Sequence, residues 1–201
     1  MVNEVLTASP ITSKERELNS LSIATVTVVL ATVTMTFGAM ITVFLIRAQA
    51  PRFWGHLQIP GILWVTTVLL LSSSATFELA RHALAGNDQS AFFKRTAVTV
   101  ALGALFLIGQ IAAWFQILHS GVVLVRNPHS WFIFLFTGLH GLHIVAGLAG
   151  LSYLLTRTRI PASGPKYQMN TRAIAKGVAI FWHYLDFLWL VLFGLLLTWR
   201  R

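Results

Sequence analysis

Residues 177–199 read GVAIFWHYLDFLWLVLFGLLLTW, and this stretch decides the fold. It contains no Lys or Arg, and Asp186 is its single acidic residue. A helix of about 20 predominantly apolar residues crosses the roughly 30 Å hydrocarbon core of a bilayer. Four further stretches of comparable length carry no formal charge, at 18–46, 57–77, 96–118 and 130–156. The sequence therefore predicts an all-α integral membrane protein, folded as a bundle of five transmembrane helices.

The composition of the 201 residues supports this class of protein and excludes several others. Hydrophobic residues make up 56% and charged residues 10%, with a mean hydropathy of +0.72. Disorder needs low hydrophobicity and high charge. The absence of cysteine excludes disulfides, thiolate nucleophiles, iron–sulfur clusters and cysteine zinc sites. The net charge of +9 does not indicate nucleic acid, because the basic residues lie between apolar runs, as in membrane proteins.

The chain divides into a polar tail and one membrane domain. We expect residues 1–20 to form a solvated cytoplasmic tail, because they mix both charges and lack the apolar core of a signal peptide. Residues 21–201 form the predicted five-helix domain. Its helices are expected at about 21–46, 57–80, 95–118, 130–156 and 177–199.

Lys and Arg are distributed unequally between the two sides of this domain. The side that holds the N-terminus carries ten of these residues, and the opposite side carries five. Loops rich in Lys and Arg stay in the cytoplasm. We therefore expect a cytoplasmic N-terminus and an external C-terminus, since five spans place the two ends on opposite sides.

A charged cluster lies where the second predicted helix ends. Glu78 precedes Arg81 by three residues and His82 by four, so the three side chains share one helix face. The favoured interpretation is an interfacial ion pair that caps the span. The alternative is a carboxylate that pairs with another helix or with a lipid headgroup, because ionisable residues in a membrane default to functional sites.

Two histidines lie in the fourth predicted helix, where residues 138–150 read GLHGLHIVAGLAG. His140, His143, Gly147 and Gly150 fall on one narrow stripe of a helix. Glycines let a neighbouring backbone approach closely, so we expect the imidazoles to hydrogen-bond to another helix. Ligation of a metal or a haem is the less favoured alternative, because two adjacent histidines on one helix do not complete such a site.

His183 and Asp186 share a face of the fifth predicted helix, near the middle of the membrane. An unpaired carboxylate at that depth is costly. Three outcomes are open: Asp186 pairs with His183 or an imidazole of the fourth helix, it is protonated, or the fifth helix starts later than residue 177. A buried structural pair is the favoured interpretation, and a proton relay is the alternative.

The sequence shows no complete catalytic site. It offers no nucleophile with a base, no glycine-rich phosphate loop, no carboxylate pair and too few grouped metal ligands. The residues by themselves indicate an integral membrane subunit that packs against partners. A small transporter is the competing class, although the internal repeats and broken helices typical of transporters are not evident.

Three segments together resemble subunit III of the haem–copper oxidases, the cytochrome c oxidase subunit III family. Residues 182–190, WHYLDFLWL, resemble the family motif WHFVDVVWL. Residues 136–143, FTGLHGLH, followed by Gly147, resemble the motif TGxHGxHV…G. Residues 71–82, LSSSATFELARH, resemble the segment LLxSSxT…AxH. Their order and spacing agree with the short bacterial form of five spans.

The resemblance implies a non-redox subunit in the bacterial inner (plasma) membrane. In this family, subunits I and II hold the haems and coppers, and subunit III binds the flank of subunit I. Subunit III holds phospholipids in a cleft between its helices and sustains proton uptake and stable turnover. The chain itself is then expected to carry no catalytic residue, cofactor or metal, and to bind no nucleic acid. Membership of a respiratory supercomplex stays open.

The polar residues of these segments are the candidates for structural or lipid-cleft contacts: Glu78, Arg81, His82, His140, His143, Trp182, His183 and Asp186. The last five match positions of the family motifs. The chain also departs from the family, because Thr34 and Ala113 lie where the family usually has carboxylates. Arg172 and Lys176 align with a family His and Glu. We therefore assign no proton-antenna function to this chain.

Two alternative functions remain beside the oxidase subunit. The first is an accessory membrane protein of a nitric oxide reductase system, which is related and of similar size. The second is a small transporter or a haem-binding membrane protein that uses His140, His143 and His183.

Overall fold

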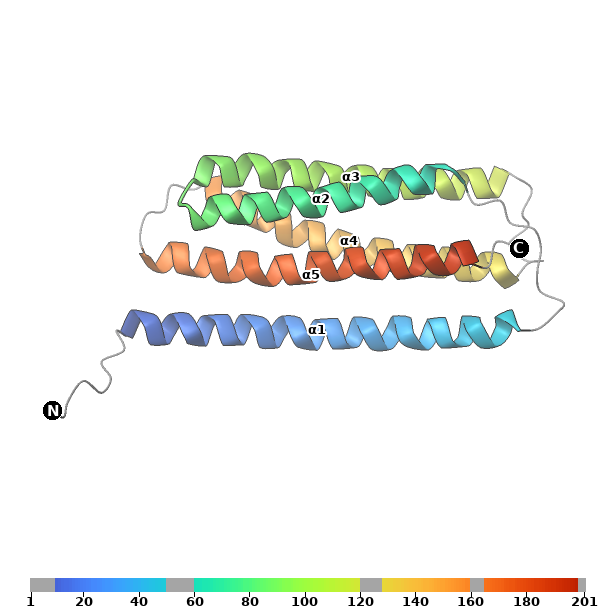
Figure 1. Cartoon of the computed structure of the whole chain (residues 1–201), viewed down its shortest axis with the longest axis horizontal. Helices are drawn as coiled ribbons and strands as arrows, with labels where there is room; N and C mark the ends of the chain where they lie inside the picture. Colours follow the sequence, from blue (N-terminus) through green and yellow to red (C-terminus); the bar gives the residue numbers. More distant parts are fainter. Residues whose placement is uncertain (1–9, 50–59, 120–127, 160–164, 199–201) are drawn as a thin grey trace.

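The computed structural model describes residues 10–49, 60–119, 128–159 and 165–198. Within these ranges the chain forms five α-helices and no strand (Figure 1). The helices are α1 (Pro10–Ala48), α2 (Ile62–Ala85), α3 (Gln89–His119), α4 (Pro128–Arg159) and α5 (Pro165–Thr198). Each contains a stretch that is long and apolar enough to cross a membrane. The predicted bundle of five transmembrane helices is therefore confirmed.

The first helix begins earlier than the sequence predicted. It starts at Pro10, so residues 10–20 continue α1 and do not form a separate tail. Proline is favoured at the first position of a helix, and the Lys, Arg and Glu residues that follow are good helix formers. Residues 1–9 of the predicted tail lie outside the described part of the chain.

The fifth helix also begins early, at Pro165 and not near residue 177. Contacts with the end of α4 stabilise this added segment. The Tyr167 hydroxyl donates to the carbonyl oxygen of Arg157, and Arg157 Nε donates to Thr171 Oγ1 at 3.1 Å. The Arg157 guanidinium also lies 5.0 Å from the centre of the Tyr167 ring. Asp186 consequently lies well inside α5, and the outcome of a later helix start is wrong.

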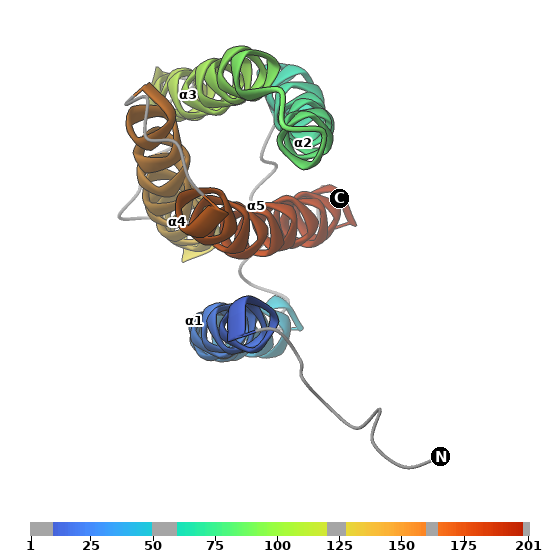
Figure 2. The same cartoon turned by 90° about the vertical axis from the view of Figure 1, so that its left-hand side faces the viewer.

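Four of the helices form a ring, and the fifth lies outside it. Seen end-on, α2, α3, α4 and α5 surround a common centre, while α1 runs beside α5 (Figure 2). Among the described residues, α1 contacts α5 and a small part of α4, and it makes no contact with α2 or α3. α5 thus contacts both α1 and α2, whereas α2 packs most extensively on α3.

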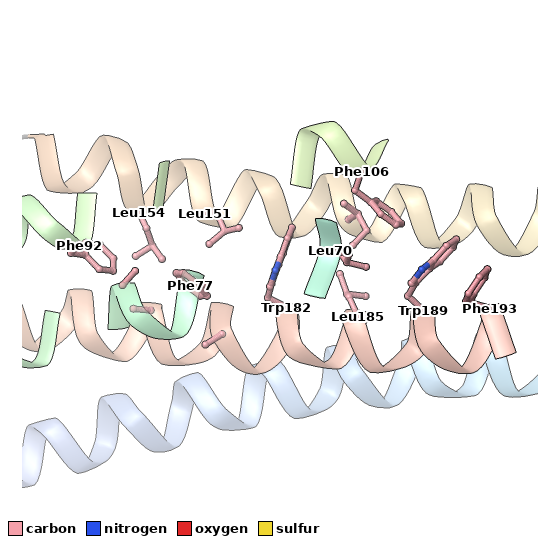
Figure 3. Packing of buried hydrophobic residues seen from close by; sticks show 14 of the residues in the cluster. Leu70, Phe77, Phe92, Phe106, Leu151, Leu154, Trp182, Leu185, Trp189 and Phe193 are labelled. Atoms are coloured by element: carbon pink, nitrogen blue, oxygen red, sulfur yellow. The ribbon is translucent and has the colours of Figure 1, made fainter. Parts of the chain in front are cut away.

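Aromatic side chains of α5 dominate the core of the ring. Trp182 and Trp189 lie on the inner face of α5, and both are almost completely buried (Figure 3). The Phe106 ring of α3 meets Trp189 edge to face, with 5.0 Å between ring centres. A second apolar cluster joins α1 to α4 and α5, and its buried members are Val33, Phe37, Phe44, Phe136, Leu188 and Leu192.

A tight turn joins α2 to α3 and fixes the beginning of α5. Asn87 has a φ of 62°, in the left-handed region that asparagine tolerates better than most residues. Asp88 Oδ1 accepts a hydrogen bond from the Ala91 N–H at 2.9 Å and so caps α3. Arg172 of α5 donates to Asn87 Oδ1 at 3.0 Å. This contact places Arg172 at the end of the α2–α5 interface.

Candidate functional site

The interface between α2 and α5 gathers most of the polar residues singled out in the sequence. Ser74 and Glu78 are one helical turn apart on α2, and His183 and Asp186 are one turn apart on α5. Ser74 Oγ lies 2.9 Å from His183 Nδ1 and is hydrogen-bonded to Asp186 Oδ2. The four side chains form a continuous polar seam, called here the α2–α5 seam.

Glu78 forms the outer part of this seam. Its Oε2 atom accepts a hydrogen bond from Arg81 Nη1 at 2.7 Å, so the structure contains the predicted ion pair on α2. Oε1 lies 3.6 Å from His82 Nε2, and Oε2 lies 3.5 Å from His183 Nε2 on α5. Both predicted interactions of Glu78 are therefore present, because its carboxylate pairs with Arg81 of its own helix and with His183 of another helix.

Asp186 forms the inner end of the seam. The residue is only 5% exposed, and its Oδ1 atom has no hydrogen-bond partner among the described residues. The predicted direct pairing with His183, or with an imidazole of α4, is wrong. Ser74 lies between the two groups and takes the place of the direct contact. The buried pair that the sequence favoured is thus a group of three residues from two helices.

Trp182 and Trp189 fasten α5 to α2 on either side of Asp186. The Trp182 indole N–H donates to Ser73 Oγ at 3.1 Å, and the Trp189 indole N–H donates to Thr67 Oγ1 at 2.9 Å. A buried indole needs such a partner to avoid the cost of an unpaired N–H. The hydroxyl groups of α2 therefore align α5 and hold Ser74 opposite His183 and Asp186.

Two glycines make room for the Trp182 ring. A Cβ atom at Gly147 of α4 would lie 2.8 Å from that ring, and one at Gly103 of α3 would lie 2.9 Å from it. Both distances are shorter than real side chains allow, so a larger residue would displace the indole. The glycine of the α4 motif is thus required by the tryptophan of the α5 motif.

The two histidines of α4 behave differently from the expectation. His140 is fully buried, and neither of its ring nitrogens has a hydrogen-bond partner among the described residues. Its ring stacks on Trp189, with 5.2 Å between ring centres. His143 Nδ1 lies 2.7 Å from the Leu139 carbonyl oxygen of its own helix. Within the described part of the chain neither histidine hydrogen-bonds to another helix, so that prediction is wrong for this pair. The side chains that the two rings meet on other helices are aromatic.

Ligation of a metal or a haem is the alternative function for these histidines. Within the described residues, no group of three or more His, Asp and Glu side chains could hold a metal ion. Glu78 does approach two imidazoles, but the Arg81 guanidinium occupies the same carboxylate. A second cation at Glu78 would be repelled.

A pocket of about 340 Å³ opens beside the outer end of the seam, at the end of the bundle where α5 begins. Its charged or titratable lining residues are Glu78, Arg81, His82, Arg172 and Lys176. Basic groups outnumber the single carboxylate, so the pocket attracts anions. The sequence predicted a fifth helix that begins after Arg172 and Lys176, so it did not place these two residues beside Glu78. Only the resemblance to the family motifs singled them out.

The contacts of Ser74 and of Thr34 were not predicted from the sequence. Ser74 was seen only as part of a serine run, and nothing in the run identifies the serine that faces α5. Thr34, at a position where the family has a carboxylate, places its Oγ1 atom 2.6 Å from the hydroxyl oxygen of Tyr184. Ala113, the second such position, is buried in the apolar core.

Comparison with known proteins identifies the family of this chain. The profile of the family Cytochrome c oxidase subunit III matches residues 32–201. A "Probable cytochrome c oxidase subunit 3" of Nocardia farcinica is 28% identical over 92% of this chain and 93% of its own length. The "Cytochrome c oxidase subunit 3" of Synechocystis is 29% identical over 78% of this chain and 66% of its own length.

A further relative extends the range of organisms. The "Cytochrome c oxidase subunit 3" of Corynebacterium diphtheriae is 30% identical over 69% of this chain and 65% of its own length. The chain thus spans about two thirds of two of these relatives and nearly all of the third. Because the profile covers α2 to α5 and the second part of α1, the chain belongs to the cytochrome c oxidase subunit III family.

Proposed function

We propose that the chain serves as the non-redox subunit III of a bacterial haem–copper terminal oxidase and binds the flank of subunit I. The family match over residues 32–201 carries this proposal. The motif residues support it, because His183, Asp186 and Trp182 bond to side chains of α2 within the same chain. Haem and copper then reside in subunits I and II.

The proposal includes a phospholipid that lies along α5. α5 contacts both α1 and α2, which do not contact each other in the described part of the chain. The face of α5 that neither helix covers carries exposed apolar side chains, Phe187, Leu190 and Val191. Such a face suits acyl chains, since none of the described helices covers these side chains.

The basic pocket supplies a matching place for the headgroup. It lies at the end of the same helix and contains Arg81, Arg172 and Lys176. Basic pockets between transmembrane helices on the cytoplasmic side bind anionic lipid headgroups. The pocket is at the end where α1 and α5 begin, which the distribution of Lys and Arg assigns to the cytoplasm. An anionic phospholipid therefore fits with its phosphate in the pocket and its chains along α5.

Affinity purification through this chain in mild detergent tests the assignment to an oxidase. We expect haem-bearing subunits to co-purify, with a Soret band and oxygen-reducing activity. Nitric oxide reduction without oxygen reduction would favour the reductase accessory protein. A single band with a Soret peak would favour haem binding by this chain, and a single band without one would favour a transporter.

Lipid retention tests the pocket separately. In the purified complex, Arg172→Gln combined with Lys176→Gln should lower the amount of anionic phospholipid that mass spectrometry detects. Lys94→Gln is a matched control, because Lys94 is an exposed basic residue at the same end of the bundle and lies outside the pocket. Equal lipid loss in the control, or none in the double variant, would contradict the proposed site.

A further inference from the structure

The hydroxyl of Ser74 has two partners and only one proton to give. Its oxygen contacts His183 Nδ1 and Asp186 Oδ2. A serine hydroxyl donates one hydrogen bond and accepts others. If Ser74 donates to Asp186, then His183 must carry a proton on Nδ1 and donate to Ser74. If Ser74 donates to His183, then Asp186 must carry the proton and donate to Ser74.

The second nitrogen of His183 fixes the number of protons in each arrangement. Nε2 lies 3.5 Å from Glu78 Oε2. The contact with Arg81 keeps the Glu78 carboxylate ionised, so Oε2 accepts hydrogen bonds and donates none. Nε2 therefore carries a proton in both arrangements. In the first, His183 is an imidazolium and Asp186 a carboxylate. In the second, His183 is neutral and Asp186 is a carboxylic acid.

The two arrangements contain the same atoms and the same number of protons. They interconvert when the Nδ1 proton of His183 moves to Ser74 Oγ while the hydroxyl proton of Ser74 moves to Asp186 Oδ2. The N–H bond of His183 breaks, an O–H bond to Asp186 forms, and Ser74 is a hydroxyl before and after. We infer that Ser74, His183 and Asp186 form a proton-holding site inside the membrane domain, in which Ser74 passes a proton between His183 and Asp186.

Burial gives this site an inner and an outer end. Asp186 is buried and its Oδ1 atom has no partner among the described residues, which favours the uncharged acid in a dry interior. The side chains of His183 and Glu78 are each 41% exposed, and Glu78 lines the basic pocket. A proton therefore reaches Asp186 from the pocket by way of His183 and Ser74.

The titratable groups around the seam come from α2, α4 and α5 itself. α2 contributes Glu78, Arg81 and His82, and α5 itself contributes Arg172 and Lys176 at the pocket. α4 contributes the buried His140 and the part-buried His143, which face aromatic rings. On α1, the polar contact to α5 is the uncharged pair of Thr34 and Tyr184. Asp186 thus has Ser74 as its hydrogen-bond partner within the described residues.

Infrared spectroscopy of the assembled complex tests this inference. We expect a carboxylic acid C=O band that disappears in Asp186→Asn and that shifts after transfer of the complex to heavy water. In Ser74→Ala the carboxylic acid band should remain. Its shift in heavy water should not occur within the time that the wild-type complex needs to complete the shift. Ser74→Thr, which keeps a hydroxyl, should retain the shift.

Thr76→Ala is the matched control, because Thr76 bonds to Thr99 of α3 and takes no part in the seam. A Ser74→Ala complex that exchanges as fast as the wild type would overturn the inference. So would a wild-type complex with no acid band that Asp186→Asn removes. If Ser74→Ala fails to assemble, infrared spectra of the unmodified complex at several temperatures provide a second test. We expect the imidazole ring bands to change together with the Asp186 band as the temperature varies. Unchanged ring bands would also overturn the inference.

Discussion

Two pairs of polar residues have the same spacing on neighbouring helices and different surroundings. His183 and Asp186 lie three residues apart on α5, and His140 and His143 lie three residues apart on α4. The α5 pair meets the hydroxyl of Ser74 and the carboxylate of Glu78. His140 has no hydrogen bond within the described residues and packs against aromatic rings. One pair forms a polar seam and the other belongs to an aromatic cluster.

The difference arises from the helix that faces each pair. α2 carries serines and a glutamate where it faces α5, so His183, Asp186 and Trp182 of α5 find partners there. Opposite His140, α3 and α5 present Phe106 and Trp189. Periodicity decides which residues share a face, but only the opposing helix decides whether that face bonds or stacks.

Trp182 should give the largest effect, because it joins α5 to both α4 and α2. Its ring packs on Gly147 of α4, and its indole N–H bonds to Ser73 of α2. We expect Trp182→Ala to lower the free energy of unfolding by about 3–5 kcal/mol, the usual cost of truncating a buried aromatic residue. Equilibrium unfolding in mixed micelles measures this loss. Phe187→Ala on the same helix is the control, since Phe187 is 63% exposed, and equal losses in the two variants would contradict the role of Trp182.

Replacing each histidine by phenylalanine tests the comparison directly. His183→Phe removes one partner from Ser74 and one from Glu78 and should cost about 1–3 kcal/mol, the penalty of leaving polar groups of an interface unsatisfied. His140→Phe should be neutral or stabilising, because it removes two unpaired nitrogens and keeps an aromatic ring beside Trp189. Equilibrium unfolding in mixed micelles measures the change in unfolding free energy for both variants. Equal losses in the two variants would contradict the distinction between the seam and the aromatic cluster.

The sequence was sufficient to predict the five helices and the residues that share a face. Long uncharged stretches determine the spans, since the bilayer allows little else. The early start of α5 was not predictable, because its first turns are polar and depend on contacts of Tyr167 and Thr171 with Arg157. The partner of Asp186 was not predictable either. Ser74 acquires that role only from the way in which α2 and α5 pack together.

The outer end of the seam should give the smallest effect. The ion pair of Glu78 and Arg81 is formed at 2.7 Å, but its side chains are 41% and 33% exposed. Exposed pairs of this kind contribute about 0–1 kcal/mol. A double-mutant cycle with Glu78→Gln and Arg81→Gln should therefore give a coupling energy in this range, and salt should reduce it further. A large coupling that salt leaves unchanged would mean that Glu78 is shielded from solvent in the assembled complex, so that the outer end of the seam is as enclosed as Asp186.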